Sequence, residues 1–153
     1  MNIYCITHKA IEGIEQLNLT PFGVGKSKFP TNYVIENSGD NISHKNNNYS
    51  ETSFHYWYWK NILNKNTNND WFGMCQYRRY FVKSKYKDLI KNDNGRQGYY
   101  PDIKNFYDLE NMLQKEPSQE WKGFDVVLCD PWSVAVKSKI KLIKRGFKSI
   151  IND

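Results

Sequence analysis

The stretch that decides the fold is Trp71-Phe-Gly-Met-Cys-Gln-Tyr-Arg-Arg-Tyr-Phe81, in which an apolar run passes directly into a cationic turn. The apolar run, residues 71–75, follows a polar loop at 64–70 and is typical of a strand covered on both faces. Arg78 and Arg79 then fall where this strand should end. In open α/β sheets, ligands bind outside the carboxyl ends of the strands, so we expect an anionic ligand at this place.

The two arginines suit phosphate for a chemical reason. Guanidinium forks match phosphate oxygens and stay charged at any working pH. Adjacent side chains on an extended strand point to opposite faces, so Arg78 and Arg79 can converge on one ligand only where the chain turns. We therefore predict that one arginine faces the ligand and that the other braces a carboxylate or a carbonyl.

The composition is that of one globular domain. The chain has 153 residues, enough for a real core, and 16% of them are aromatic, including eleven Tyr and five Trp. Cys5, Cys75 and Cys129 each lie in an apolar, strand-like run, which favours reduced core thiols and a cytosolic protein. The first apolar run begins at Ile3 without a basic start, so we expect neither a secretion signal nor a transmembrane helix.

Most of the net charge of +6 belongs to one segment. Residues 137–153 contain six basic residues and one acid, and their apolar residues repeat at helical spacing. This basic amphipathic tail suits an anionic membrane surface and equally a core helix with a basic outer face. A nucleic-acid-binding module is a rival interpretation of a basic, aromatic-rich chain. Charge confined to one tail disfavours it, and we expect no nucleic acid as partner.

Residues 2–7 are the predicted first strand, because they are rich in β-branched and aromatic side chains. Thr7, His8 and Lys9 end this strand and offer a hydroxyl, an imidazole and an ammonium at the expected ligand edge. Plain solvation explains His8 equally well.

The next elements are short. Residues 10–29 predict a weak helix followed by a short strand and its turn at 21–25, and another short strand is predicted at 33–36. Gly23 and Gly25 do not open a helix, so they are not a dinucleotide-binding fingerprint.

A helix is predicted from residue 49 to about residue 64, because Asn48 can cap it and Glu51 lies three positions further on, as in a capping box. One face of this helix, at helical spacing, consists of Phe54, Trp57, Tyr58, Asn61 and Ile62. A second set of residues widens the apolar arc, namely Tyr56, Trp59 and Leu63. We expect this aromatic run to be core, since base-stacking platforms lie on exposed sheet faces.

The loop before this helix is polar and leads to a helix N-terminus, where backbone N–H groups and the helix dipole favour an anion. Its candidate ligand residues are Asp40, Asn41, Ser43, Lys45 and Asn46. The alternative is that this Asn-rich segment only forms turns.

The second half adds three expected elements. Residues 82–101 are polar and poorly periodic, with a turn at 92–95, and are expected to form a loop beside the site. An amphipathic helix is predicted at 105–115, and residues 124–129 are the clearest buried strand. This alternation predicts an α/β fold with a mostly parallel sheet flanked by helices.

Several motifs together resemble one known family: Gly39-Asp-Asn-Ile-Ser-x-Lys-Asn46, Glu51-Thr, Tyr56-Trp-x-Trp-Lys-Asn61 and Gly73-x-Cys-x-Tyr-Arg-Arg-Tyr-Phe81. The pattern is similar to that of the bacterial capsular and exopolysaccharide glycosyltransferases, a family long catalogued as a domain of unknown function. Ile6-Thr-His-Lys9, residues 124–128 and Arg145-Gly-Phe147 also fit, so the match runs in order along the whole chain. The resemblance implies a GT-A-like, Rossmann-type fold that is incomplete at its C-terminus, because family members continue further.

The resemblance also implies a reaction. A sugar would pass from a nucleotide-sugar, expected to be UDP-linked with UDP-galactofuranose as one candidate, to a lipid-linked glycan of a surface polysaccharide. Residues 1–153 would be a single donor-side domain, cytoplasmic and in peripheral contact with the inner face of the cell membrane through residues 137–153.

Family roles carry over onto the matching positions. The donor-site candidates are Thr7, His8, Lys9, Asp40, Asn41, Ser43, Lys45, Asn46, Gln76 and Tyr77, with Arg78 and Arg79 as catalytic residues. Negative charge develops on the departing nucleoside diphosphate in the transition state, and a fixed arginine there would lower the barrier.

The chain departs from the family pattern in three respects. Gln76 stands where family members commonly have His before Tyr-Arg-Arg, so an imidazole is not required there. No Asp-x-Asp triplet occurs, so the usual GT-A metal site is not readable from the sequence. Two alternatives stay open, a divalent Mg or Mn ion held in another way and arginines that replace the metal. The family's C-terminal continuation would hold the acceptor side, so a non-catalytic remnant that keeps the donor fold is the second interpretation.

Overall fold

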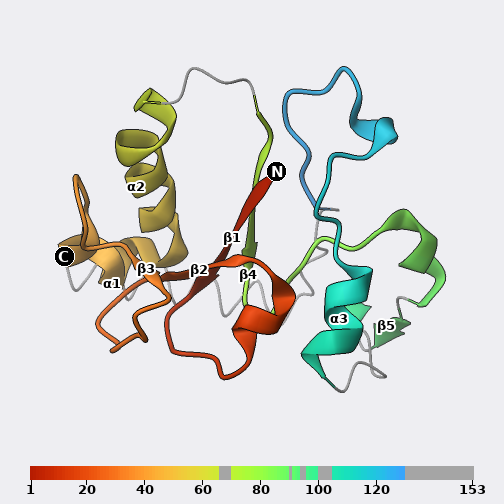
Figure 1. Cartoon of the computed structure of the whole chain (residues 1–153), viewed down its shortest axis with the longest axis horizontal. Coiled ribbons are helices and arrows are strands. Elements are labelled where there is room, and N and C mark those ends of the chain that lie inside the picture. The colour runs from red at the N-terminus through yellow and green to blue at the C-terminus, as the bar shows by residue number, and fades with distance from the viewer. Residues whose placement is uncertain (66–69, 90, 94–95, 100–104, 130–153) are drawn as a thin grey trace, which may run out of the picture.

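The centre of the protein is a four-stranded, all-parallel sheet in the order β3-β2-β1-β4 (Figure 1). The computed structural model describes residues 1–65, 70–89, 91–93, 96–99 and 105–129. The strands are β1 (Asn2–Thr7), β2 (Thr20–Gly23), β3 (Val34–Ile35) and β4 (Phe72–Gln76). With its flanking helices, this sheet confirms the predicted α/β fold.

One face of the sheet is covered by α2 (Ser53–Asn61). Tyr4 and Phe22 of the sheet pack against Phe54 and Trp57 of the helix, with the ring centroids of Phe22 and Phe54 4.8 Å apart. Because these rings are buried in the core, the aromatic run of α2 is not a base-stacking platform. This confirms the predicted core face of the helix.

The start of this helix differs from the prediction. A short α1 (Asn46–Tyr49) and a 3-10 turn (Ser50–Thr52) precede α2, and Ser50 has a φ of 49°, outside the right-handed helical region. The carbonyl of Ser50 accepts hydrogen bonds from the side chains of Asn46 (3.0 Å) and Ser53 (2.8 Å). Such side-chain to backbone bonds compete with the helical ladder, so the single helix predicted from residue 49, capped by Asn48, was wrong.

The outer side of α2 was also predicted to be more buried than it is. Trp59 is 47% exposed, and Leu63, in a 3-10 turn after the helix (Leu63–Lys65), is 50% exposed. The ammonium of Lys60 lies 4.1 Å from the Trp59 ring centroid. Only the face that meets the sheet belongs to the core, since nothing described packs over the other side.

The second face of the sheet is covered by a 3-10 helix (Ile14–Leu17) and by α3 (Phe106–Met112). Ile14, Leu17 and Leu109 pack with Cys5 of β1 in this second core cluster. The Asn105 side chain caps α3 by accepting a hydrogen bond from the N–H of Asp108 at 2.9 Å. The helix predicted at 105–115 is therefore confirmed in a shorter form.

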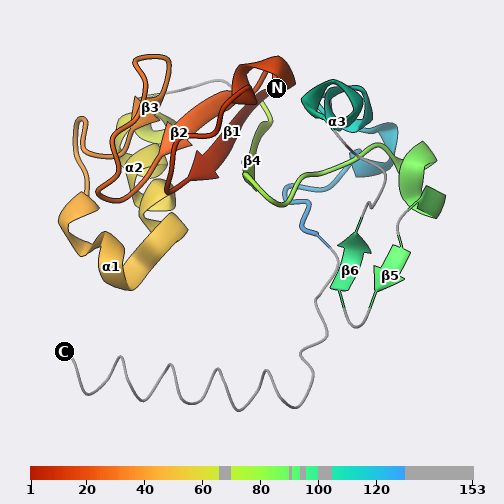
Figure 2. The same cartoon turned by 90° about the horizontal axis from the view of Figure 1, so that it is seen from below.

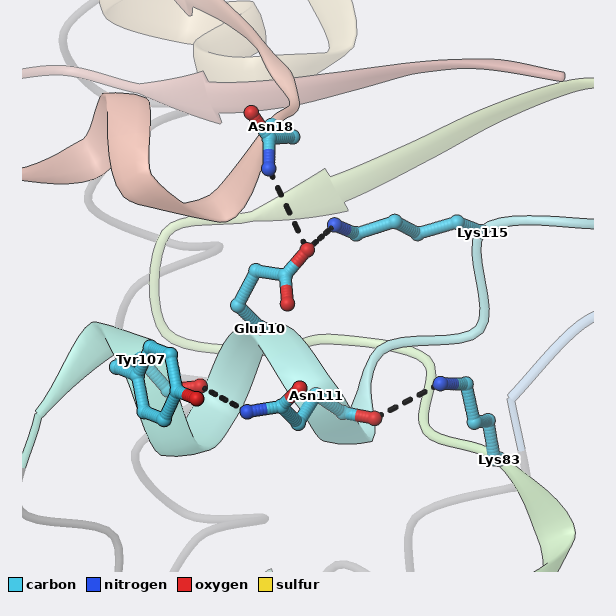
Figure 3. Close-up of polar contacts among 6 residues, drawn as sticks. All are labelled: Asn18, Lys83, Tyr107, Glu110, Asn111 and Lys115. Carbon is cyan, nitrogen blue, oxygen red and sulfur yellow. Dashed lines mark hydrogen bonds and ion pairs between the residues drawn. The ribbon is translucent and has the colours of Figure 1, made fainter.

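Polar contacts hold α3 in place (Figure 3). Glu110 pairs with Lys115 and accepts a hydrogen bond from Asn18, which follows the 3-10 helix, at 3.4 Å. Lys83 donates to the backbone carbonyl of Asn111 at 2.8 Å, which ties the chain after β4 to the end of the helix. Residues far apart in sequence thus fix α3 against the sheet.

Two predicted buried strands differ from the structure. Strand β4 exists, but it is the last strand of the described sheet; Cys75 is buried, whereas Phe72 is 39% exposed. Residues 124–129 form no described strand, and Phe124, Val126 and Leu128 are 63%, 66% and 80% exposed. An apolar sequence becomes a buried strand only where neighbouring elements pair with it and cover it.

Residues 82–101 contain more regular structure than predicted. Strands β5 (Lys91–Asp93) and β6 (Arg96–Tyr99) pair in an antiparallel hairpin on either side of the expected turn (Figure 2). The predicted basic tail at 137–153 lies outside the described residues. Among the helices that are described, none is long and apolar enough to cross a membrane.

Candidate functional site

The carboxyl ends of the parallel strands meet at one edge of the sheet. β1 ends at Thr7, β2 at Gly23, β3 at Ile35 and β4 at Gln76, and the segments that follow them therefore lie together. This edge carries most of the predicted site residues.

Tyr77 is the centre of a basic group at this edge. Its backbone N–H donates to the carbonyl of Ile6 at 3.1 Å, which attaches the residue to β1. Three basic groups lie near the centroid of the Tyr77 ring. The His8 ring centroid is 5.3 Å from it, the Lys9 ammonium is 5.7 Å from it and the Arg78 guanidinium carbon is 4.8 Å from it. Three basic side chains from two different segments thus surround one aromatic ring. We call these four residues the Tyr77 cluster.

A tight turn after β4 positions Arg78. The N–H of Arg79 donates to the carbonyl of Gln76 at 2.9 Å, and the N–H of Gln76 donates back to the carbonyl of Arg79 at 3.2 Å. The Tyr80 hydroxyl donates to the carbonyl of Tyr77 at 2.8 Å. The chain therefore turns at the place where the sequence required a turn, and both arginine side chains are exposed.

The charges of the cluster are open to a ligand. Within the described part of the chain, Lys9 and Arg78 form no ion pair, since the two pairs found there are Met1–Glu116 and Lys115–Glu110. Stacking on an aromatic ring holds a cation loosely, at about 0.5–1 kcal/mol for an exposed site. The arrangement presents oriented positive charge to solvent, as phosphate binding requires.

Thr7 has a structural task. Its hydroxyl is fully buried, donates to the carbonyl of Lys9 at 2.6 Å and accepts from the N–H of Lys9 at 3.2 Å. The Ser27 hydroxyl donates to the carbonyl of His8 at 2.7 Å. These bonds shape the loop that carries His8 and Lys9, so Thr7 positions the cluster and does not face a ligand.

Glu36 is an important residue that the sequence analysis did not single out. It follows β3, is 1% exposed, and accepts a hydrogen bond from the N–H of Gly25 at 2.6 Å. Its second oxygen accepts from the Ser53 hydroxyl, in a short bond, and from the Asn46 side chain at 3.4 Å. This buried carboxylate joins the segments after β2 and β3 to the start of α2. A carboxylate at the last position of a predicted strand was the one available signal.

Gly25 completes this junction. Its φ of +85° is a conformation that other residues rarely adopt, and a Cβ there would lie 3.2 Å from Oδ1 of Asn46. Glycine thus allows the backbone to approach Glu36 and Asn46 closely.

The predicted loop residues 40–46 do not all reach this edge. Asp40 lies at the other end of α2, where its N–H and carbonyl bond the Asn61 side chain and its carboxylate accepts from the Tyr56 hydroxyl at 3.1 Å. Asn41 Oδ1 accepts from the N–H and hydroxyl of Ser43, at 3.2 and 2.8 Å, so this pair forms a turn. Lys45 is exposed, and Asn46 is part of the Glu36 junction.

Glu51 lies beside the Tyr77 cluster and does not close the expected capping box. Its carboxylate accepts a hydrogen bond from the Ser50 hydroxyl at 2.5 Å, and this bond is the main reason that the pKa of Glu51 is lowered. Partial burial opposes the shift, and the positive charges of His8 and Arg78 add to it. Glu51 is therefore within electrostatic reach of two members of the cluster.

Two further features lie apart from this edge. Trp71, Trp121 and Phe124 line a pocket of about 320 Å³ beside the amino end of β4, the end opposite to Tyr77. Among the described residues, no three His, Cys, Asp or Glu side chains gather as a metal site would need.

Comparisons with known proteins place the chain in a family without naming its activity. No curated protein and no solved structure matches it. A family model, "Domain of unknown function (DUF4422)", matches residues 2–149, nearly the whole chain. The chain therefore belongs to the DUF4422 family.

Proposed function

We propose that the Tyr77 cluster binds the diphosphate of a nucleotide-sugar, and that the chain is the donor-binding part of a glycosyltransferase. The observation that supports this most directly is the convergence of His8, Lys9 and Arg78 around one ring at the carboxyl edge of a parallel sheet. Ligands of open α/β folds bind at this edge, and its positive charge suits a diphosphate.

The chemistry of sugar transfer suits such a site. When the bond between the sugar and the diphosphate breaks, negative charge grows on the leaving diphosphate. A cation already fixed nearby stabilises this charge without reorganisation, and this lowers the barrier. In this proposal Arg78 has that role, Lys9 and His8 bind the ground-state diphosphate, and Arg79 braces the turn.

The identity of the donor and acceptor rests on the resemblance of the sequence motifs. A UDP-linked sugar such as UDP-galactofuranose is the donor that we propose, with a lipid-linked glycan as acceptor. A lipid-linked acceptor places the reaction at the inner face of the cell membrane, which the basic segment 137–153 would contact.

Thermal unfolding with added nucleotides tests the donor site. UDP at about a hundred times its Kd should stabilise the chain by about 2.7 kcal/mol, a rise in Tm of roughly 5–10 °C. Arg78→Ala should weaken UDP binding by about tenfold or more, since hydrogen bonds to charged groups contribute about 1.5–3 kcal/mol. Lys87→Ala, which removes the same charge from an exposed site after β4, is the matched control.

The outcomes separate the interpretations. A shift with UDP that Arg78→Ala reduces to about half or less and Lys87→Ala keeps supports the donor site, whereas no shift with any nucleotide refutes it. Release of UDP from the nucleotide-sugar, dependent on added lipid-linked glycan, then distinguishes a transferase from a remnant that binds the donor and does not turn over.

A further inference from the structure

Glu51 is held at the edge of the Tyr77 cluster by the same junction that contains Glu36. Asn46 donates to the carbonyl of Ser50 at 3.0 Å, and Ser53 bonds to the buried carboxylate of Glu36. The segment that carries Glu51 is therefore fixed to the sheet on both sides of the residue. Figure 2 shows the carboxyl end of β1, which leads to His8, close to the end of α1, which leads to Glu51.

Glu51 lies within electrostatic reach of cations but forms no ion pair with a described residue. The charges of His8 and Arg78 act on its carboxylate, yet neither of the ion pairs between described residues includes Glu51. Direct contact between opposite charges is favourable. If these side chains had only a structural role, we would expect them to form an ion pair. Opposite charges that stand apart leave room for a group that interacts with both.

A nucleotide-sugar has the two kinds of group that this arrangement can bind. Its diphosphate is anionic and suits Arg78, Lys9 and His8. Its sugar carries hydroxyls, which donate hydrogen bonds, and an ionised carboxylate is an acceptor with two oxygens. Of the nearby carboxylates, Glu36 is buried and has both oxygens bonded, whereas Glu51 is half-buried and accepts its hydrogen bond from Ser50 through one oxygen.

We propose that Glu51 binds the hydroxyls of the donor's sugar and so makes the site select a nucleotide-sugar over the bare nucleotide. This rests on the proposed function, because it assigns the sugar half of the same ligand. The carboxylate accepts hydrogen bonds from the sugar, and its negative charge repels the additional charge of a free terminal phosphate. Glu51 thus sets donor specificity, and the cations supply most of the affinity.

Calorimetric titration of Glu51→Gln with UDP and with UDP-galactose, as an available UDP-sugar probe, tests this role. Gln keeps the shape of the side chain and removes its charge. Binding of UDP should become tighter by a few-fold, because a repulsion is lost, while binding of UDP-galactose should become weaker by about tenfold, because charged acceptors form stronger hydrogen bonds than neutral ones. Asp88→Asn removes one negative charge from an exposed position after β4 and should change neither affinity.

A second variant covers the case in which Glu51→Gln does not fold. Glu51→Asp keeps the charge and withdraws the carboxylate by one methylene, so it should bind UDP as the wild type does and lose its preference for UDP-galactose. Equal changes for both ligands, or no change in either, would overturn the role of Glu51 while leaving the donor site intact. Failure of the wild-type chain to bind UDP would overturn the donor site itself, so the two failures are distinguishable.

Discussion

Replacing Glu36 with Ala should destabilise the protein strongly, because the carboxylate is both buried and the common acceptor of three donors. It is 1% exposed and accepts from the N–H of Gly25 at 2.6 Å, from the Ser53 hydroxyl and from the Asn46 amide. Ala removes both carboxylate oxygens, in a site with little access to water.

The magnitude follows from the donors that are left. A buried donor without a partner costs about 1–3 kcal/mol, and two of these three donors have other acceptors nearby, since Ser53 and Asn46 can both bond the Ser50 carbonyl. The N–H of Gly25 is left without a partner, at about 1–3 kcal/mol, and Ser53 and Asn46 each lose one hydrogen bond, at about 1 kcal/mol each. We therefore expect a total loss of about 3–5 kcal/mol, a large part of the roughly 5–15 kcal/mol by which a domain is stable. Glu36→Gln should cost about half as much, because it keeps one oxygen as acceptor and turns an NH₂ group toward the other donors.

Urea unfolding followed by tryptophan fluorescence measures these losses, with the core residue Trp57 as a reporter on α2, the helix that begins at Ser53. Glu15→Ala is the matched control, since this exposed glutamate should change stability by less than about 0.5 kcal/mol. If Glu36→Ala and Glu36→Gln both stay within that range, the carboxylate is not the acceptor that holds the three segments together, and the account of this edge fails.

Two further predictions test the backbone and the core. Gly25→Ala should lower the stability measured by thermal unfolding by about 1 kcal/mol or more beyond the loss caused by Gly123→Ala. Both glycines have a positive φ, but only at Gly25 would the added methyl group press on Asn46. Equal losses would show that backbone strain alone matters. In the native protein Ellman's reagent should modify the exposed Cys129 quickly and the two core cysteines, which face each other across β1 and β4, only after unfolding. Rapid loss of all three thiols would contradict the burial of that pair.

The local elements of the first half were predictable because neighbouring residues encode them. The strand at 2–7 and the short strands near 21–25 and 33–36 follow from β-branched and aromatic runs bounded by turn formers. The turn at Arg78 and Arg79 followed from the end of an apolar run. Their common edge then followed from the parallel order, since the carboxyl ends of parallel strands meet.

Features that depend on residues far apart in sequence were not predictable. Nothing near Glu36 in the sequence indicates that Gly25, Asn46 and Ser53 will surround it, so its burial emerges only when three segments meet. The side-chain bonds from Asn46 and Ser53 to the carbonyl of Ser50 separate α1, which ends at Tyr49, from α2, which begins at Ser53, against a local pattern that favoured one continuous helix.

The sequence by itself determined the fold class, the location of the first strands and the residue types at one edge of the sheet. These features depend on the spacing of apolar residues and on residue type, which are local properties. The tertiary structure alone decided which candidates meet there. It brought His8, Lys9, Tyr77 and Arg78 together, moved Asp40 to the far end of α2, and left residues 124–129 exposed despite their apolar sequence. The physical reason is that burial, pairing and electrostatic contact are properties of neighbours in space, which packing of the sheet and helices sets.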